Sequence, residues 1–156
     1  MPNVDGYESY ILKNEELAWV GSMLCNQIKK ITGHDHEIKS AIVFAQSPEN
    51  IQGLHVDGFN TQRIGASNWA LNLPITEVGE MLWYGGKFNL AVADSGTSAL
   101  KYLKLNWQEE PRVIESLIVD RPTIVRVDIP HQVINQSRER RRLVLSARFT
   151  PDIFDW

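Results

Sequence analysis

The sequence predicts a mainly β protein with one long helix, built as a double-sheet jelly roll, or double-stranded β-helix. One segment near the N-terminus has helical spacing of its apolar residues, and turn residues divide the rest of the chain into short β-rich runs. A helix followed by eight or so strands is typical of a jelly roll with the helix packed outside one sheet. We therefore expect one domain over residues 1–156, in which helix 14–32 supports a core of about 40–150.

The helical segment carries recognisable start and stop signals. Asn14 can cap its N-terminus, two acidic residues follow in the first turn, and two lysines precede Gly33, which ends the helix. Apolar residues recur at helical spacing, so one stripe of the helix can pack on a sheet. This stripe consists of Leu17, Val20, Leu24, Ile28 and Ile31.

The β-rich runs are short and bounded by turn residues. We expect strands within residues 40–46, 51–56, 68–75, 87–93, 113–119, 122–129, 131–135 and 141–149. Residues 76–80 are expected to form a turn between two of them. The segment 95–112 is harder to interpret, and we expect a loop insertion that carries a helical turn.

Composition narrows the classes of function. A net charge of −3 argues against a nucleic-acid binder, because phosphate contacts usually require a basic excess. Cys25 is the only cysteine, which favours a reducing compartment. The N-terminus has no secretory signal pattern, and no segment is apolar for long enough to cross a membrane. We expect a cytoplasmic protein without a membrane partner.

His55 and Asp57 are two positions apart in an apolar run, so on a strand both side chains point to the same face. His131 opens another predicted strand, and in a jelly roll strands that are distant in sequence become neighbours. Two imidazoles and one carboxylate on one face of a metal ion leave three coordination positions open, as in non-haem Fe(II) oxygenases. The alternative is structural: an Asp that accepts a hydrogen bond at a strand end, and a His satisfied in the core.

An arginine near the end of the chain can supply a second kind of contact. Arg141 and Arg142 open the last predicted strand, and a buried guanidinium pairs well with a carboxylate. Strand alternation places Arg142 and Ser146 on one face and the more apolar residues on the other, which suits the helix. We therefore prefer Arg142 over Arg141 as the cavity residue. The same alternation in residues 68–75 makes Asn72 a candidate polar contact.

These residues, in this order, resemble the Fe(II)/2-oxoglutarate-dependent dioxygenases. The resemblance spans residues 54–149 and consists of His55-Val56-Asp57, then His131, then Arg141 or Arg142. The segments LWYGGKFNLAV and DRPTIVRVDIPHQVIN are similar to the family's GG-containing turn and to its approach to the second His. The closing segment HQVINQSRERRRLVLSARF is similar in pattern to the prolyl and aspartyl hydroxylases.

The resemblance implies an enzyme. It implies that the two histidines and the aspartate hold Fe(II), and that Arg142 or Arg141, with Ser146 and Asn72 nearby, binds the co-substrate 2-oxoglutarate. The implied reaction uses O2 and hydroxylates a C–H bond of a small molecule or an amino-acid side chain. Two other functions fit the same strand pattern: a jelly-roll module that binds a ligand without catalysis, and a cupin-like metalloenzyme that is not an oxygenase.

Two further motifs receive structural interpretations. His34 and His36 follow the helix in a polar stretch, where exposed loop histidines are the usual outcome. Trp83 and Tyr84 precede two glycines and could line a substrate wall, but packing is the more common role of such aromatic residues.

Overall fold

The computed structural model describes residues 6–57, 66–94 and 101–154. Within these ranges the chain forms one helix and ten strands. In chain order they are β1 (Tyr7–Ile11), α1 (Asn14–Thr32), β2 (Glu37–Gln46), β3 (Trp69–Thr76), β4 (Gly79–Gly85), β5 (Phe88–Asp94), β6 (Lys101–Trp107), β7 (Arg112–Val119), β8 (Thr123–Arg126), β9 (His131–Asn135) and β10 (Arg142–Thr150).

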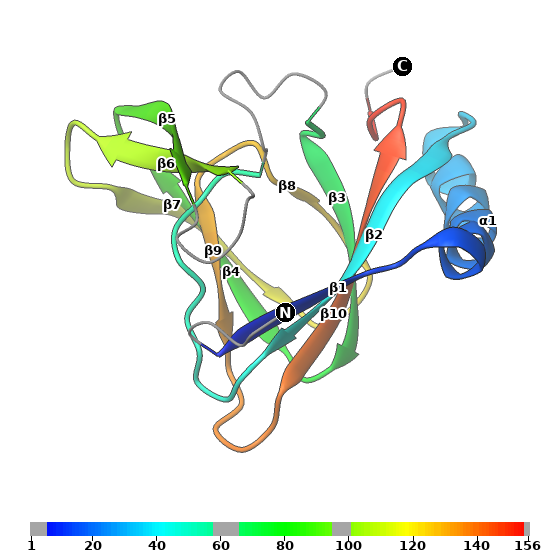
Figure 1. Cartoon of the computed structure of the whole chain (residues 1–156), viewed down its shortest axis with the longest axis horizontal. Coiled ribbons are helices and arrows are strands. Elements are labelled where there is room, and N and C mark those ends of the chain that lie inside the picture. The colour runs from blue at the N-terminus through cyan, green and yellow to red at the C-terminus, as the bar shows by residue number, and fades with distance from the viewer. Residues whose placement is uncertain (1–5, 58–65, 95–100, 155–156) are drawn as a thin grey trace.

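Two antiparallel sheets face each other (Figure 1). The larger has the order β1-β2-β10-β3-β8 and the smaller the order β7-β4-β9, while β5 and β6 form a separate hairpin. The segment 51–56 joins the smaller sheet through bridges to β9. After β2 the chain passes to the smaller sheet, returns in β3, crosses to β4 and β7, and then alternates through β8, β9 and β10. This alternation defines a jelly roll and confirms the predicted fold class.

Helix α1 covers the outer face of the larger sheet (Figure 1). Its buried residues Val20, Leu24 and Ile28 pack in one cluster with residues of β2, β3 and β10. The sheet residues of that cluster are Ala41, Leu71, Ala147 and Phe149. Strand alternation was therefore read correctly, because the apolar face of β10 meets the helix.

The helix approaches β2 closely because Gly21 has no side chain. A Cβ on Gly21 would lie 2.4 Å from Cγ2 of Ile38, so any larger residue would push α1 away from the sheet. At the C-terminal end, Gly33 has the left-handed φ of 78° and its N–H donates to the Lys29 carbonyl, as predicted for a helix stop.

A second apolar cluster fills the space between the sheets. Ala70 and Val125 come from the larger sheet, Met81 and Trp83 from β4, and Val119 and Val127 complete it. The Trp83 indole N–H donates to the Arg126 carbonyl at 3.0 Å. Trp83 thus has the packing role that the sequence favoured.

Three elements differ from the sequence prediction. Residues 76–80 were expected to be a turn, but strand β4 begins at Gly79. The segment 95–112 was expected to be a loop with a helical turn, but residues 101–107 form β6 and pair with β5. Strand β1 was not predicted; it is short, and it forms only because β2 offers an edge to pair with.

The helix start and the run 51–56 also need correction. The N-cap residue is Lys13, whose side chain makes no capping hydrogen bond, and Asn14 is the first residue of the helix. The prediction that Asn14 caps the helix was therefore wrong. Ile31 is 61% exposed and lies at the edge of the buried stripe. The run 51–56 is not a regular strand, because it pairs through isolated bridges at Ile51 and His55.

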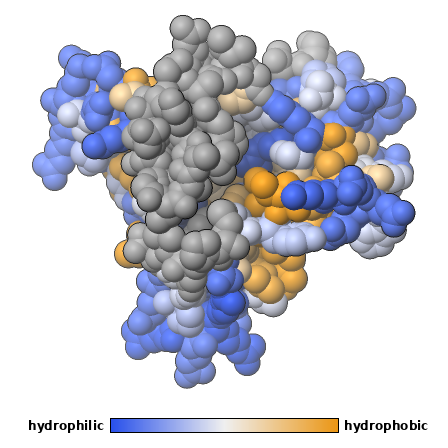
Figure 2. Space-filling view, viewed as in Figure 1, coloured by the Kyte–Doolittle hydropathy of each residue, from blue (hydrophilic) through white to orange (hydrophobic). Residues whose placement is uncertain are grey.

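The basic run 137–142 belongs mostly to the turn between β9 and β10, a hydrophilic projection in Figure 2. Arg138 lies 3.7 Å from Glu49, and Arg140 lies 3.5 Å from Glu77. These charges are therefore balanced by acidic neighbours. The described residues form one helix, α1, and it lacks the combination of length and apolar character that crossing a membrane requires.

Candidate metal centre

The two predicted histidine ligands meet through a pair of backbone hydrogen bonds. The His55 N–H donates to the His131 carbonyl at 3.0 Å, and the His131 N–H donates to the His55 carbonyl at 2.8 Å. This antiparallel pair places the two rings side by side, with their centroids 4.4 Å apart. Residues 76 positions apart in sequence are therefore direct neighbours.

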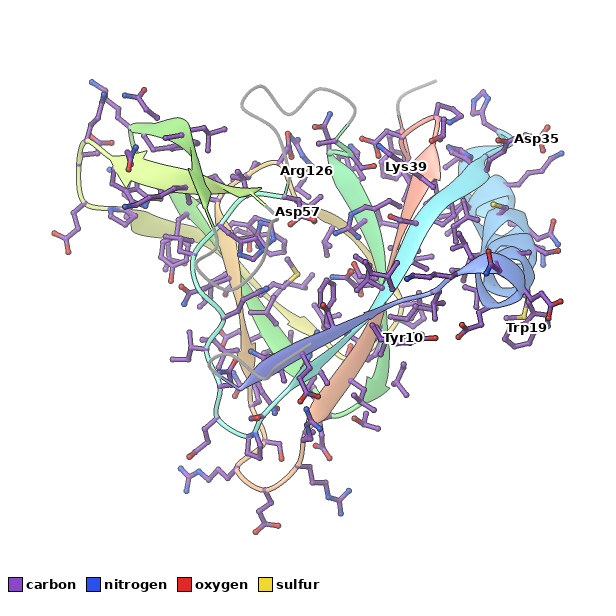
Figure 3. All side chains as sticks on the ribbon, viewed as in Figure 1. Tyr10, Trp19, Asp35, Lys39, Asp57 and Arg126 are labelled. Carbon is purple, nitrogen blue, oxygen red and sulfur yellow. The ribbon has the colours of Figure 1, made fainter. Side chains whose placement is uncertain are left out.

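Asp57 completes the group from the same face of the segment. Its N–H donates to the Val127 carbonyl at 2.9 Å, which fixes the backbone between the sheets. Its Oδ1 lies 3.5 Å from Nε2 of His55 and 3.5 Å from Nε2 of His131. Figure 3 shows Asp57 between the two sheets, near one end of the jelly roll. One ligand atom from each of His55, Asp57 and His131 lies within 4.8 Å of the other two, and among the described residues this is the one group of three or more His, Cys, Asp or Glu side chains that could hold a metal ion.

Hydrogen bonds to carbonyl groups set the tautomer of both histidines. Nδ1 of His55 lies 2.8 Å from the Gly53 carbonyl oxygen, and Nδ1 of His131 lies 2.7 Å from that of Ile129. A carbonyl only accepts, so each Nδ1 carries the hydrogen, and each neutral ring presents the lone pair of Nε2. Two nitrogen lone pairs and a carboxylate oxygen therefore converge, as a metal requires of its ligands.

The pKa values indicate that this cluster attracts positive charge. Burial acts to lower the pKa of His55, but the hydrogen bond and charge of Asp57 outweigh it and the pKa is raised. Burial acts to raise the pKa of Asp57, but hydrogen bonds from His131 and His55 and the charge of Arg148 hold it well below its usual range. A proton on Nε2 of His55 lets that ring donate to Asp57, and a metal ion bound by the three residues would take the place of that proton.

Arg148 is a site residue that the sequence analysis missed. Its Nη2 donates to Oδ2 of Asp57, and its Nη1 donates to Oγ of Ser146 at 2.6 Å. The guanidinium engages the carboxylate oxygen that faces away from the imidazoles, so Oδ1 is left for an ion. Arg148 lies six residues after Arg142 in β10, so strand alternation places both arginines on the same face. Applied to the whole strand, this rule would have identified Arg148 from the sequence.

Arg142 and Arg141 lie on opposite sides of β10. Arg142 is 2% exposed and lines the cavity next to the three candidate ligands. The side chain of Arg141 is 48% exposed and pairs with Glu8 at 2.7 Å. The structure thus places the preferred arginine inside and its alternative outside, while the role of Arg142 stays a prediction.

Ser146 and Asn72 also line this cavity, as strand alternation predicted. The Ser146 hydroxyl donates to Oδ1 of Asn72 at 2.5 Å and accepts from Arg148. A chain of hydrogen bonds therefore runs from Asn72 through Ser146 and Arg148 to Asp57. The predicted contact of Ser146 and Asn72 with a co-substrate is not tested by this arrangement.

The cavity that these residues line is small. Its volume is about 50 Å³, little more than the roughly 30 Å³ that one water molecule occupies in the liquid. A larger ligand extends out of this space, past the partly exposed side chains of His55 and Asp57, or moves lining side chains. Met81, an unbranched side chain that adapts readily, and Arg148 both line the cavity.

The second histidine pair lies elsewhere. His34 is exposed, but His36 is only 7% exposed and packs edge-on against Phe149, with ring centroids 6.3 Å apart. The expectation of an exposed His36 was therefore wrong, because its ring is covered by contact with Phe149 of the helix cluster.

Comparison with models of protein families gives no match, and neither does comparison with curated proteins. Among solved structures, the chain is similar to a prolyl-4-hydroxylase from Pseudomonas putida, with 14% identity, a TM-score of 0.46, and coverage of 95% of this chain and 73% of that one. It is also similar to an oxidoreductase of the 2OG-Fe(II) oxygenase family from Burkholderia pseudomallei, with 11% identity and a TM-score of 0.45. The similarity covers 92% of this chain and 64% of that one.

A third similar structure is an oxalate oxidase, with 15% identity, a TM-score of 0.41 and coverage of 94% of this chain. The chain spans about half of that protein, 52% of its length. Similarity at this level carries no information on activity. The fold rests on the strand order, and together with the site it defines the protein as a jelly roll with a His-X-Asp…His group that could bind a metal ion.

Proposed function

We propose that the protein is an Fe(II)- and 2-oxoglutarate-dependent dioxygenase that hydroxylates a C–H bond of a small molecule or of an amino-acid side chain in a peptide. The observation that carries this proposal is the position of Arg142. Its buried guanidinium lines the same cavity as His55, Asp57 and His131. An acid that chelates a metal at one end and pairs with an arginine at the other fits these two demands.

The donor set suits Fe(II). Two neutral imidazole nitrogens and one carboxylate oxygen are the ligands of non-haem Fe(II) sites that keep positions open for other molecules. The Gly53 and Ile129 carbonyls orient the imidazoles, and Arg148 orients the carboxylate. Bound together, Fe(II) and 2-oxoglutarate would supply the oxidation, in which O2 is consumed, the co-substrate loses CO2 to become succinate, and the substrate gains a hydroxyl group.

The side chains of the protein bind, orient and exclude water. Arg142 pairs with the distal carboxylate of the co-substrate and compensates its charge in a buried place. Met81, Val127 and Val133 line the cavity and make part of its wall apolar. The C–H bond that is hydroxylated belongs to a substrate that would approach the coordination positions that the three ligands leave open.

Anaerobic titration tests the proposal. Fe(II) followed by 2-oxoglutarate should produce the visible charge-transfer band of the chelate, and addition of O2 should produce succinate. His131→Ala should abolish both signals. Arg142→Ala removes a hydrogen-bonded charge pair worth about 1.5–3 kcal/mol, so the Kd for 2-oxoglutarate should rise roughly 10- to 150-fold. Arg141→Ala is the matched control. It should change neither the charge-transfer band nor the Kd for 2-oxoglutarate, because Arg141 pairs with Glu8 outside the cavity.

The cavity volume favours a second candidate, a cupin-like metalloenzyme that acts on a small acid without 2-oxoglutarate. A cavity of about 50 Å³ accepts a two-carbon acid with less movement of side chains than a five-carbon acid. Binding of oxalate together with Fe(II), unaffected by Arg142→Ala, and no band with 2-oxoglutarate would favour this candidate over the dioxygenase.

A further inference from the structure

Gly79 lies against the guanidinium of Arg142. A Cβ on Gly79 would be 2.2 Å from Nε of Arg142, 2.6 Å from its Cζ and 2.9 Å from its Nη2. Gly79 belongs to β4 of the smaller sheet, and Arg142 belongs to β10 of the larger sheet. The arginine side chain therefore crosses the space between the sheets and rests on the backbone of the opposite one.

The backbone conformation does not explain this glycine. Gly6, Gly33 and Gly86 have positive φ angles, whereas Gly79 is in a strand and does not. A β-branched or larger residue would be the usual choice at a buried strand position. Space for the guanidinium is the constraint that remains.

Both partners are buried, and the backbone of Gly79 is paired on both sides. Gly79 is paired on one side with Val119, which is fully buried, and on the other with Asn135, which is 1% exposed. Arg142 is 2% exposed and lies opposite Gln46, which is fully buried. A side chain added at position 79 would therefore displace the guanidinium, which is the flexible partner, within its buried surroundings.

We propose that Gly79 is a positioning residue that sets where the Arg142 guanidinium lies, and so sets the fit of an acid that bridges the metal centre and Arg142. This inference rests on the proposed function. Moving Nε from 2.2 Å to an ordinary contact of at least 3.4 Å requires a shift of 1.2 Å or more. A shift of this size breaks the hydrogen bonds between the guanidinium and the distal carboxylate, and loss of such charged hydrogen bonds raises a Kd about 10- to 100-fold.

The test compares three proteins in anaerobic titrations with Fe(II) and two 2-oxo acids. Gly79→Ala should raise the Kd for 2-oxoglutarate by about 10- to 100-fold and leave that for Fe(II) unchanged. Pyruvate has the same chelating end but no distal carboxylate, so its Kd should not change. A general distortion of the structure would weaken both acids.

Gly85→Ala is the matched control on the same strand. Its Cβ would lie 2.9 Å from Cγ2 of Ile114, a residue that is 55% exposed and can move outward. This variant carries the same change in strand propensity without reaching Arg142. Its Kd for 2-oxoglutarate should equal that of the wild type.

A double variant keeps the inference open to refutation if Gly79→Ala folds poorly. If residue 79 acts through the guanidinium, Gly79→Ala should have no further effect on 2-oxoglutarate binding or on stability in an Arg142→Ala background. An effect that persists there overturns the inference. So does a wild type that binds 2-oxoglutarate while Gly79→Ala binds it equally well. A wild type that does not bind 2-oxoglutarate with Fe(II) overturns the proposed function and this inference together.

Discussion

Arg148 offers a direct test of how the candidate metal centre is held in place. Its guanidinium donates to Oδ2 of Asp57 and to the hydroxyl of Ser146, and the side chain is 16% exposed. Arg148→Met keeps the length and much of the packing of the side chain but removes both donors. We expect Asp57 to lose its orientation and the metal-free protein to lose stability.

The size of the effect follows from the burial of the pair. A hydrogen bond to a charged group contributes about 1.5–3 kcal/mol, and the 25% exposure of the Asp57 side chain places this contact inside that range rather than above it. We expect a loss of about 2 kcal/mol in the free energy of unfolding, or a fall of about 4–8 °C in Tm for a chain of this size. Loss of a group that orients a ligand typically weakens metal affinity about 10- to 100-fold.

Urea unfolding of the metal-free protein measures the stability, and a double-mutant cycle with Asp57→Asn isolates the pair. Arg141→Met is the control, because the Arg141 pair with Glu8 is exposed and should contribute less than about 1 kcal/mol. A coupling energy between Arg148 and Asp57 that is no larger than the error of the cycle would refute the reasoning.

The remaining predictions concern the helix and pH. Ile28 is fully buried between α1 and the sheet, so Ile28→Ala should cost about 2–5 kcal/mol in urea unfolding, whereas Ile31→Ala, at a 61% exposed position, should change stability by about 0.5 kcal/mol or less. The pKa of His55 is raised in the folded state, so its contribution is complete below the unfolded value of 6.5 and is lost as pH rises through the folded value. The Tm of the metal-free protein should therefore fall above about pH 6.5 more steeply than that of Asp57→Asn; equal slopes in the two proteins would contradict this.

The face that a residue occupies on a strand could be predicted from the sequence. Alternation alone separated Arg142 from Arg141 and put Ala147 and Phe149 under the helix, as the structure shows. The period of two is a local property of the backbone and needs no knowledge of the neighbouring strands. The same rule would have reached Arg148 if it had been applied to the end of the strand.

Strands that depend on a partner could not be predicted in this way. In residues 101–107 the polar residues Lys101, Lys104 and Asn106 do not recur with a period of two, so the pattern does not indicate a strand. Residues 101–107 form β6 because every residue pairs with one of β5. The meeting of His55 with His131 is also nonlocal, and it was expected only through the jelly-roll arrangement and the family resemblance.

The candidate metal centre depends on a few backbone hydrogen bonds rather than on a long strand. The segment that carries His55 and Asp57 pairs through isolated bridges, and Val56 between them is 4% exposed and does not line the cavity that the two ligands line. Burial of Val56 turns both flanking side chains the other way, because successive residues in an extended chain face opposite sides. The paired amides of His55 and His131, with the Asp57 amide on Val127, then fix the depth of the two ligands between the sheets. An irregular segment can therefore present two ligands as accurately as a regular strand does.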